Sequence, residues 1–454
     1  MIVGGGISGL AAAGRLQELG RSVRLLEPDG RVGGVMRSER VEGFLFEHGP
    51  TSLMTNHREV FGLCERLGLA ERRVDANRSA RRRYLMKNGR LCPLPLGPID
   101  FVRTTLWSGG AKLRLLAEPF IARNRSGEEE SVGQFVTRRF GRELLDYGFD
   151  PFVSGVYAGD PAHLSMQSTF SRLVEWERRR GSVIRGALMS GRDRPRESER
   201  PMPRRLFSFK EGVAELPLAM GRLLGDAVRC GSRAIRLRPQ GDGWLVEAEE
   251  AEGARQYGAS AVMLAAPADG AAALLEPLAP EAARALGAVP YAPIAVVFFG
   301  FQRADVGHPL DGFGCLLPGR EGSRLLGSLW SSTIFPDRAP AGMVAVTNYL
   351  GGAKRPELVE RAESELAAIA LEELRRWLGV TGAPRLTRVV RRPRAIPQYV
   401  IGHEARLRAI EQSLDKWPTL ALIGNYLRGV SVPDCIVQAR AAADRVAARL
   451  PGRS

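Results

Sequence analysis

The stretch IVGGGISGL, residues 2–10, stands at the very start of the chain, and the strand-like segment SVRLLE, residues 22–27, follows it. Gly4, Gly6 and Gly9 form a G-x-G-x-x-G turn. The first glycine of such a turn allows a tight bend from strand to helix, the second lets the backbone approach a diphosphate, and the third lets the helix pack on the strand. The sequence therefore predicts a β-α-β unit that binds a dinucleotide. Its helix, over 9–19, would present its amino end to the phosphates.

An acidic residue ends the second strand of this unit. Glu27 lies near the expected spacing of about 20 residues and is placed to accept hydrogen bonds from ribose hydroxyls. The other residues of these turns that we expect to contact the cofactor are Gly5, Ile7, Ser8 and Pro28.

Two further turns extend the predicted cofactor site. In RVGG (31–34), Gly33 and Gly34 permit a second close approach of the backbone, and Arg31 can hold a phosphate or cover an adenine. The segment FEHGPTS (46–52) adds a rigid turn whose backbone can line a flavin. The residues expected there are Gly49, Pro50, Thr51 and Ser52.

The carboxyl-terminal stretch IGNYLRGVSVPDCI (423–436) supplies the other end of the site. Pro433 suits the first turn of a helix, where its missing N–H costs nothing, and the preceding N–H groups would face an anion such as the N1 region of a reduced flavin. A proline-capped surface helix is the alternative. The residues expected at the cofactor are Gly424, Asn425, Val430, Ser431 and Val432. Because features of a cofactor site occur at both ends of the chain, we expect a dinucleotide-binding domain whose sequence is interrupted by insertions.

The bulk composition describes an ordinary globular protein with an arginine excess. A chain of 454 residues predicts two or three domains, and its net charge of +15 favours anionic partners. The densest basic stretch, 191–205, is interpreted as a solvated loop, with contact to a membrane surface as the alternative. Aromatic residues do not interleave with these arginines, so nucleic acid is not an expected partner. The five cysteines and five histidines form no ligand-spaced cluster, which predicts no metal site and a reducing cytoplasm.

No transmembrane helix is expected. The longest uncharged run, 285–302, is interrupted by Pro290 and Pro293, and IAVVFFGF within it is typical of a buried strand. We expect no leader before the glycine turn. The first strand is so short that we expect the native chain to begin upstream of Met1.

The pattern along the chain predicts an α/β and α+β fold. We expect a helix over 56–75, a hairpin over 81–95 with its turn at Asn88-Gly89, a helix over 355–378 and a terminal helix over 433–449. The predicted domains are a Rossmann-like, FAD-binding domain (1–75, 206–270 and 396–454), a mixed-sheet, substrate-binding domain (76–95 and 271–395), and a helical insertion that is a candidate for membrane contact (96–205).

The chain resembles the oxygen-dependent protoporphyrinogen oxidases of the flavin amine oxidase superfamily, above all the myxobacterial and plant-type enzymes. Beyond the glycine turns quoted above, the motifs that carry this resemblance over essentially the whole chain are SGVYAGDP (154–161), YAPIAVVFFGF (291–301), GFGCLLP (312–318), LGSLWSS (326–332), LGGA (350–353) and IPQY (396–399). Monoamine oxidases usually have arginine after the double glycine, where this chain has Val35. No carboxyl-terminal cysteine motif for covalent attachment is present, so FAD is expected to bind non-covalently.

The resemblance implies oxidation of protoporphyrinogen IX to protoporphyrin IX in heme synthesis. Three two-electron oxidations would use flavin N5 as the hydride acceptor and O2 as the final acceptor, with hydrogen peroxide as product. No side chain is assigned a catalytic role. Coproporphyrinogen III is the alternative substrate, an amine oxidase or carotenoid desaturase is a more distant enzyme, and a catalytically silent flavin-fold scaffold is the alternative from another class of protein.

The resemblance also implies a set of substrate contacts. Arg83 matches the family's propionate anchor, although Arg81 and Arg82 adjoin it and any of the three can be a plain surface charge. Leu316 and Leu329 match apolar residues that sandwich a pyrrole, or are ordinary core. The remaining candidates are Tyr349, where the family has Phe or Met, and Gly155 and Gly159. These two glycines either permit close approach of the backbone to the macrocycle or simply form a turn.

Several positions depart from the family pattern. Pro433 replaces the usual Asn, Ala234 stands where a valine meets the adenine, and Arg392 stands where near relatives have Trp beside the flavin. Arg392 would add positive charge near the flavin. The candidate partners besides substrate and O2 are a peripheral membrane surface, ferrochelatase and a second copy of the chain. The residues that suggest membrane contact are Phe101, Trp107, Leu113, Leu115, Leu116 and Phe120.

Overall fold

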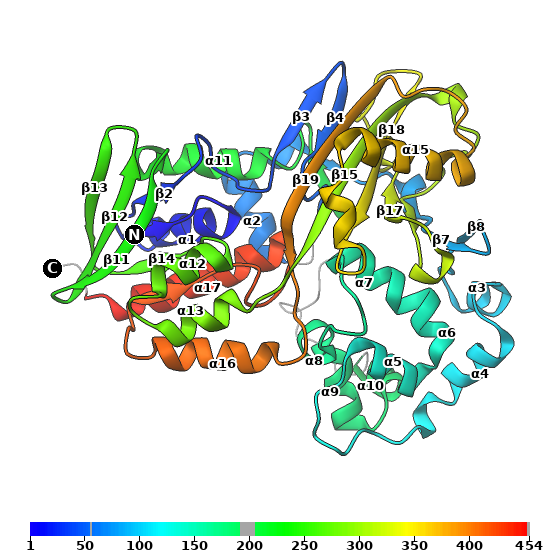
Figure 1. Cartoon of the computed structure of the whole chain (residues 1–454), viewed down its shortest axis with the longest axis horizontal. Coiled ribbons are helices and arrows are strands. Elements are labelled where there is room, and N and C mark those ends of the chain that lie inside the picture. The colour runs from blue at the N-terminus through cyan, green and yellow to red at the C-terminus, as the bar shows by residue number, and fades with distance from the viewer. Residues whose placement is uncertain (55–56, 191–204, 452–454) are drawn as a thin grey trace.

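The computed structural model describes residues 1–54, 57–190 and 205–451 (Figure 1). The basic stretch 191–205 therefore lies, except for its last residue, outside the described residues. Figure 1 shows a layered α/β part around the amino terminus, a mixed sheet beside it, and a cluster of short helices below that sheet.

A five-stranded parallel sheet forms the centre of the first part. Its order is β10-β2-β1-β14-β20, and every neighbouring pair is parallel. The strands are β1 (Ile2–Val3), β2 (Leu25–Glu27), β10 (Val228–Cys230), β14 (Val262–Leu264) and β20 (Leu420–Leu422). Ile2 and Val3 belong to two different hydrophobic cores, because successive side chains of a strand point to opposite faces. The sheet is thus covered on both sides, as parallel sheets require.

Helices and a small sheet cover the two faces. On one face α1 (Ile7–Glu18) packs against α17 (Val432–Arg449), and α11 (Glu215–Leu224) contributes to the same core. On the other face lie α12 (Ala268–Leu275), α13 (Pro280–Gly287) and α16 (His403–Leu414), with an antiparallel sheet of β11 (Arg233–Gln240), β12 (Gly243–Glu250) and β13 (Gly253–Ala259). The sequence did not predict α16.

A seven-stranded mixed sheet forms the second part, with the order β19-β15-β18-β17-β16-β7-β8. Its strands are β7 (Tyr84–Lys87), β8 (Arg90–Pro93), β15 (Tyr291–Gln302), β16 (Gly314–Leu316), β17 (Leu325–Leu329), β18 (Met343–Gly351) and β19 (Leu386–Pro397). The expected hairpin turn is confirmed, since Asn88 and Gly89 have φ of 52° and 72°. The helix α15 (Glu363–Leu378) covers one face of this sheet and buries Leu366 and Leu374 there.

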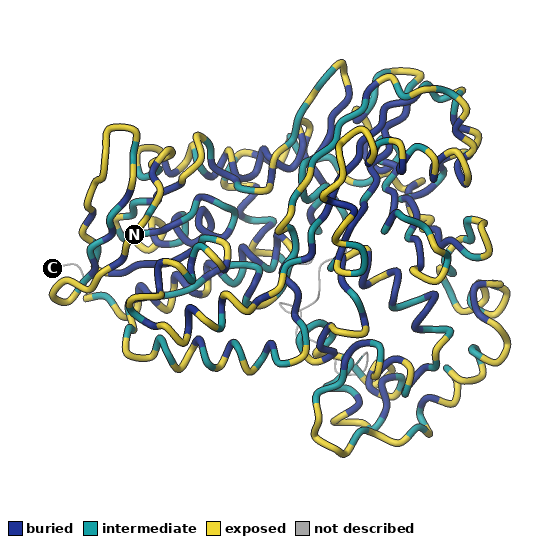
Figure 2. The backbone as a smooth tube through the Cα atoms, viewed as in Figure 1, coloured by how far each residue is buried: buried dark blue, intermediate teal, exposed yellow. Residues whose placement is uncertain are grey.

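Pro293 does not end the buried strand. Instead β15 runs through it, and the register with β19 shifts between Ala292 and Ile294. A bulge is one of the few places where a sheet accepts a proline. Figure 2 shows the buried backbone concentrated in this sheet and in the parallel sheet, with exposed residues on the outer loops.

Short helices form the third part, as the sequence predicts for the described residues of 96–200. They are α3 (Pro98–Arg103), α4 (Gly109–Leu116), α5 (Val132–Phe140), α6 (Arg142–Leu144), a π-helix (Leu145–Phe149), α7 (Asp150–Tyr157), α8 (Met166–Thr169), α9 (Ser171–Arg180) and α10 (Val183–Ser190). Their core contains a fully buried ion pair between Arg139 and Glu118. In the described part of the chain, no helix is both long enough and apolar enough to cross a membrane.

The structure corrects two helix boundaries. The helix expected over 56–75 is only α2 (Arg58–Arg66). A left-handed Gly68 follows its last turn, and the chain then forms β6 (Arg73–Asp75). The helix expected from 355 begins only at Glu363, because 356–360 forms a 3₁₀ turn. The remaining strands are β3 (Ser38–Val41), β4 (Phe44–Glu47), β5 (Leu53–Met54) and β9 (Leu206–Phe209).

Candidate active site

An apolar cavity of about 510 Å³ lies where the two large sheets and α7 meet. Part of its lining follows the carboxyl ends of β1, β14 and β20, which is where parallel sheets bind ligands. The rest is one face of the seven-stranded sheet and the end of α7. The predicted residues that line it are Gly6, Ile7, Ser8, Gly33, Gly34, Gly49, Pro50, Thr51, Gly155, Leu316, Leu329, Tyr349, Gly424, Asn425, Val430 and Val432.

In the glycine turn at the start of α1, the backbone packs tightly at Gly9 and leaves open space beside Gly6. A Cβ on Gly9 would lie 1.9 Å from the Gly4 carbonyl oxygen, so the turn requires glycine there. A Cβ on Gly6 would meet no atom within 4 Å, although Gly6 directly precedes the helix. No side chain caps the helix at Gly6. The first N–H groups of a helix bind anions, so this opening fits the diphosphate of a dinucleotide.

Glu27 is buried and holds two neighbouring backbone segments. The Gly5 N–H donates to Oε2 at 2.6 Å, and the Asp29 N–H donates to Oε1 at 2.9 Å. Burial raises the pKa of the Glu27 carboxyl. Each carboxylate oxygen can accept a second hydrogen bond, so ribose hydroxyls can still bind Glu27. Pro28 follows it at the exposed surface.

The double-glycine turn lies directly against the first turn. The Gly33 N–H donates to the Gly5 carbonyl at 2.8 Å. The Arg31 guanidinium donates to the carbonyl oxygens of Val32 and Gly34 at 3.0 and 2.9 Å. Arg31 therefore holds its own loop in shape, and its direct contact with a cofactor stays a prediction.

The segment after β4 brings Gly49 to the cavity beside Val35. A Cβ on Gly49 would lie 2.5 Å from the Val35 carbonyl oxygen, so glycine is needed for this approach. Arg392 donates from Nε to the His48 carbonyl at 3.2 Å. Burial, with Arg31 and Arg37 nearby, lowers the pKa of the Arg392 guanidinium. Arg392 thus stands next to the predicted flavin loop, although it does not line the cavity.

The start of α17 forms another wall. Pro433 lies in its first turn as predicted, and the Ser431 hydroxyl accepts a hydrogen bond from the Asp434 N–H at 3.2 Å. Val432 and Cys435 line the cavity. Burial raises the pKa of the Cys435 thiol to about 11, so the thiol is neutral near pH 7.

An apolar wall faces these glycine turns. Gly155 on α7 lies so close to Leu316 on β16 that an added Cβ would be 2.4 Å from the leucine Cδ2. Leu329 on β17 and Tyr349 on β18 continue the wall. Burial raises the pKa of the Tyr349 hydroxyl, so this group stays neutral. Such a wall can hold a flat apolar ring system and exclude water.

Several predicted residues lie outside the cavity lining. Arg83 is exposed, with its guanidinium 5.2 Å from the centre of the Phe313 ring. Ala234 lies on β11. An added Cβ on Gly159 would lie 2.7 Å from the Gln398 Oε1, so Gly159 packs behind the apolar wall. Ser52 and Ser431 adjoin lining residues without lining the cavity themselves.

Sequence reasoning missed part of the lining. The missed residues include Ala265, Ala266, Pro267, Tyr291, Ile294, Ser154, Tyr426 and Arg394. The segment 265–267 directly follows the buried strand β14, and that position was the available signal. Arg394 gave no signal, because β19 was not recognised as a strand.

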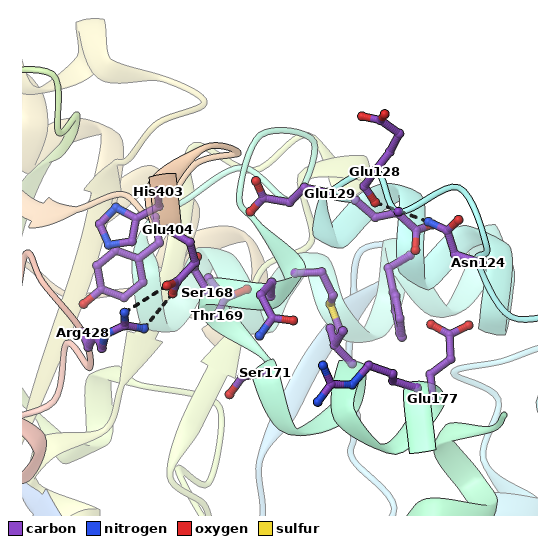
Figure 3. Close-up of a pocket in the computed structure, with 18 of the residues that line it drawn as sticks. Asn124, Glu128, Glu129, Ser168, Thr169, Ser171, Glu177, His403, Glu404 and Arg428 are labelled. Atoms are coloured by element: carbon purple, nitrogen blue, oxygen red, sulfur yellow. Dashed lines mark hydrogen bonds and ion pairs between the residues drawn. The ribbon is translucent and has the colours of Figure 1, made fainter. Parts of the chain in front are cut away.

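A larger, polar cavity of about 1150 Å³ lies between the helical part and α16. Figure 3 shows its mixed charges, including the Arg428–Glu404 pair with N–O distances of 2.8 and 2.9 Å. It offers neither a glycine turn nor an apolar wall, and none of the predicted residues lines it. We therefore place the candidate active site in the smaller cavity. Among the described residues, no group of His, Cys, Asp and Glu is arranged to hold a metal ion.

Comparisons with known proteins give one consistent family. The model of the family described as "Flavin containing amine oxidoreductase" matches residues 7–447. The mitochondrial protoporphyrinogen oxidase of Nicotiana tabacum is 33% identical, over 98% of this chain and 94% of that protein. The coproporphyrinogen III oxidase of Bacillus subtilis is 28% identical, over 97% of this chain and 96% of that protein. A solved structure from Exiguobacterium sp. 255-15 shares the fold, with a TM-score of 0.82 at 24% identity over 99% of this chain and 98% of that one.

Proposed function

Because this chain belongs to the flavin-containing amine oxidoreductase family, we propose that it oxidises protoporphyrinogen IX to protoporphyrin IX with O2 as the electron acceptor. The chain is an oxidoreductase of this family and its cofactor is FAD. In the proposed reaction six hydrogens leave the porphyrinogen as three hydride–proton pairs. Three O2 accept them and become three H2O2.

The single observation that carries the choice of substrate is the chemistry of the cavity lining. Leu316, Leu329 and the neighbouring strands form an apolar wall opposite the glycine turns. Among the described residues, Arg394 is the only charged side chain in this lining. A macrocycle with two propionates needs fewer cations than coproporphyrinogen III with four, so the lining favours protoporphyrinogen.

The chain's own residues would bind and orient rather than exchange protons. The FAD supplies the hydride acceptor when it is bound. Gly155 lets α7 pack directly against Leu316, and Leu316 and Leu329 would keep the face of the macrocycle dry. Since the described lining contains no acidic or histidine side chain, the protons would leave to solvent without a general base.

Coproporphyrinogen III is the second candidate substrate. The specific observation in its favour is that relatives named for this substrate match nearly the whole chain. Coproporphyrinogen III would need further cations for its additional propionates, and exposed arginines such as Arg83 are the candidates.

The test is to purify the protein with bound FAD and supply each porphyrinogen separately under air. We expect the red fluorescence of protoporphyrin IX to grow together with hydrogen peroxide, at three peroxides per porphyrin. Faster oxidation of coproporphyrinogen would favour the second candidate. A yellow protein that oxidises neither compound would contradict both.

We also propose that α3, α4 and the following turn contact a membrane surface. Leu113, Leu116 and Phe120 are 68, 69 and 84% exposed, and the basic residues Arg103 and Arg123 lie exposed nearby. Such a mixture is typical of interfacial segments. Trp107, expected to belong to this surface, is instead buried against Phe101.

A further inference from the structure

We propose that Arg394 binds a carboxylate of the substrate and thereby fixes the orientation of the porphyrinogen in the cavity. This inference rests on the proposed function. Its starting point is that one guanidinium lies in a mostly apolar lining whose other described side chains are uncharged. Arginine is well suited to a carboxylate, because its planar fork can donate two parallel hydrogen bonds.

A local irregularity of the sheet brings Arg394 to the cavity. On β19, Arg392 pairs with Ile294 of β15 and Ile396 pairs with Ala292. The residues 393–395 therefore lie opposite the single Pro293. Extra residues of this kind bend a strand and re-aim its side chains, and such bulges are frequent beside active sites. Arg394 stands in the middle of this bulge.

The guanidinium of Arg394 is held loosely enough to accept a ligand. Its Cζ lies 4.4 Å from the centre of the Tyr291 ring, within the range of a cation–π contact. Its ion pair with Asp269 is long, with 3.6 Å between Nε and the carboxylate oxygen. Both partners are about half exposed, with side-chain exposures of 48 and 56%. A substrate carboxylate can therefore replace or join Asp269 at little cost.

The position of Arg394 favours the substrate over the cofactor diphosphate. Ala395 and Ile396 join Ile294, Val296 and Tyr349 in one apolar cluster on the same face of the sheet. Arg394 marks the end of that apolar wall. A macrocycle lying on the wall would extend its propionates beyond its apolar ring, toward such an end. The diphosphate has its own cradle in the backbone around Gly6.

The experiment measures kcat and KM for protoporphyrinogen IX and for its dimethyl ester, which lacks both carboxylates. The variants are Arg394→Met, Arg394→Lys and the matched control Arg391→Met. Arg391 is exposed on the same strand, donates to the Arg361 carbonyl at 3.3 Å and lies outside the cavity lining. FAD content and FAD affinity are measured in parallel by flavin fluorescence.

For Arg394→Met we expect KM for the free acid to rise about tenfold, as for the loss of one charge-assisted hydrogen bond. The rise in KM should be smaller for Arg394→Lys and absent for the dimethyl ester, while kcat, FAD affinity and the KM of the Arg391→Met control stay unchanged.

An equal rise in KM with the ester, or no rise with the free acid, overturns the inference. Weaker FAD binding with unchanged KM assigns Arg394 to the diphosphate and also overturns it. A wild-type protein that oxidises neither compound overturns both the proposed function and this inference. If the wild type is active, the proposed function holds and the variants test the role of Arg394 alone.

Discussion

At the scale of single residues, the opening in front of Gly6 gives the most direct test of the cofactor site. Gly6 has φ of −68° and ψ of 176°, which alanine also adopts, and its Cβ would enter open space. We predict that Gly6→Ala leaves the melting temperature of the apoprotein unchanged but weakens FAD binding about tenfold or more. The reason is that the methyl group displaces a phosphate from backbone N–H groups, and one such charged hydrogen bond contributes about 1.5–3 kcal/mol.

Titration of the apoprotein with FAD, followed by quenching of flavin fluorescence, measures this loss. Gly14→Ala is the matched control, because Gly14 lies on the same helix and its added Cβ also meets no atom within 4 Å. Equal FAD affinity in the wild type and in Gly6→Ala would contradict the assignment of this turn to the diphosphate.

Glu47 is a buried acid that makes stability depend on pH. Its Oε2 accepts from the Ser38 hydroxyl at 2.5 Å and its Oε1 accepts from the Val213 N–H at 2.9 Å, yet burial raises the pKa of Glu47 to about 7. Between the unfolded pKa near 4.5 and about 7, the folded state keeps a proton that the unfolded state releases. The unfolding free energy should therefore fall as pH rises through this window, by about 3 kcal/mol in total.

Glu47→Gln should remove this dependence, because the amide is neutral at every pH. We expect the variant to be more stable than wild type at pH 8, by about 1–3 kcal/mol, and nearly equal to it at pH 4.5. Urea unfolding at both pH values measures the difference. A variant that is destabilised equally at both pH values would show that the hydrogen bonds of Glu47, and not its charge, decide its contribution.

At the scale of elements, the features that the sequence predicts well are those set by local residues. The Asn88-Gly89 turn and the proline start of α17 depend on the backbone preferences of a few neighbours. The bulge in β19 was not predictable, because it exists only in the pairing of 393–395 with Pro293, about 100 residues away. The end of α2 just before Gly68 was missed for the opposite reason, since the apolar pattern of EVFGLCERLGL outweighed a local glycine signal.

The helices α3 and α4 allow a test of the proposed membrane surface. We predict that the triple change Leu113→Gln, Leu116→Gln and Phe120→Gln lowers sedimentation with anionic phospholipid vesicles several-fold and leaves the melting temperature nearly unchanged. The reason is that exposed apolar side chains contribute burial in lipid and little packing in the fold. The control is Leu223→Gln on α11, where the leucine is 63% exposed but lies in the dinucleotide-binding part. Equal loss in both variants would contradict a specific surface on α4.

At the scale of the whole molecule, the glycine-turn side of the cavity could be predicted from the sequence more fully than the apolar wall opposite it. The glycine turns and Glu27 form one continuous local unit, so residues 4–34 could be assigned to a dinucleotide directly. The apolar wall assembles from α7 and from strands that follow it by up to about 240 residues. Leu316, Leu329 and Tyr349 were found only through the family resemblance. Arg394 was found by neither route. The domain boundaries themselves stay a prediction.

The assembly of one cavity from distant segments predicts that FAD stabilises the whole chain. Residues of the first β-α-β unit, of α7, of the seven-stranded sheet and of the start of α17 all line the same space. A ligand that binds only the folded state adds about 1.4 kcal/mol of unfolding free energy for each tenfold increase in its concentration above Kd. We therefore expect the melting temperature to rise continuously with FAD concentration, in one cooperative transition.

FMN, which lacks the adenosine and one phosphate, should give a much smaller shift of the melting temperature at equal concentration, because Glu27 and half of the diphosphate cradle stay unbound. Differential scanning calorimetry of the apoprotein with each flavin measures both shifts. Equal shifts with FMN and FAD would contradict a dinucleotide that spans the cavity from Glu27 to α17.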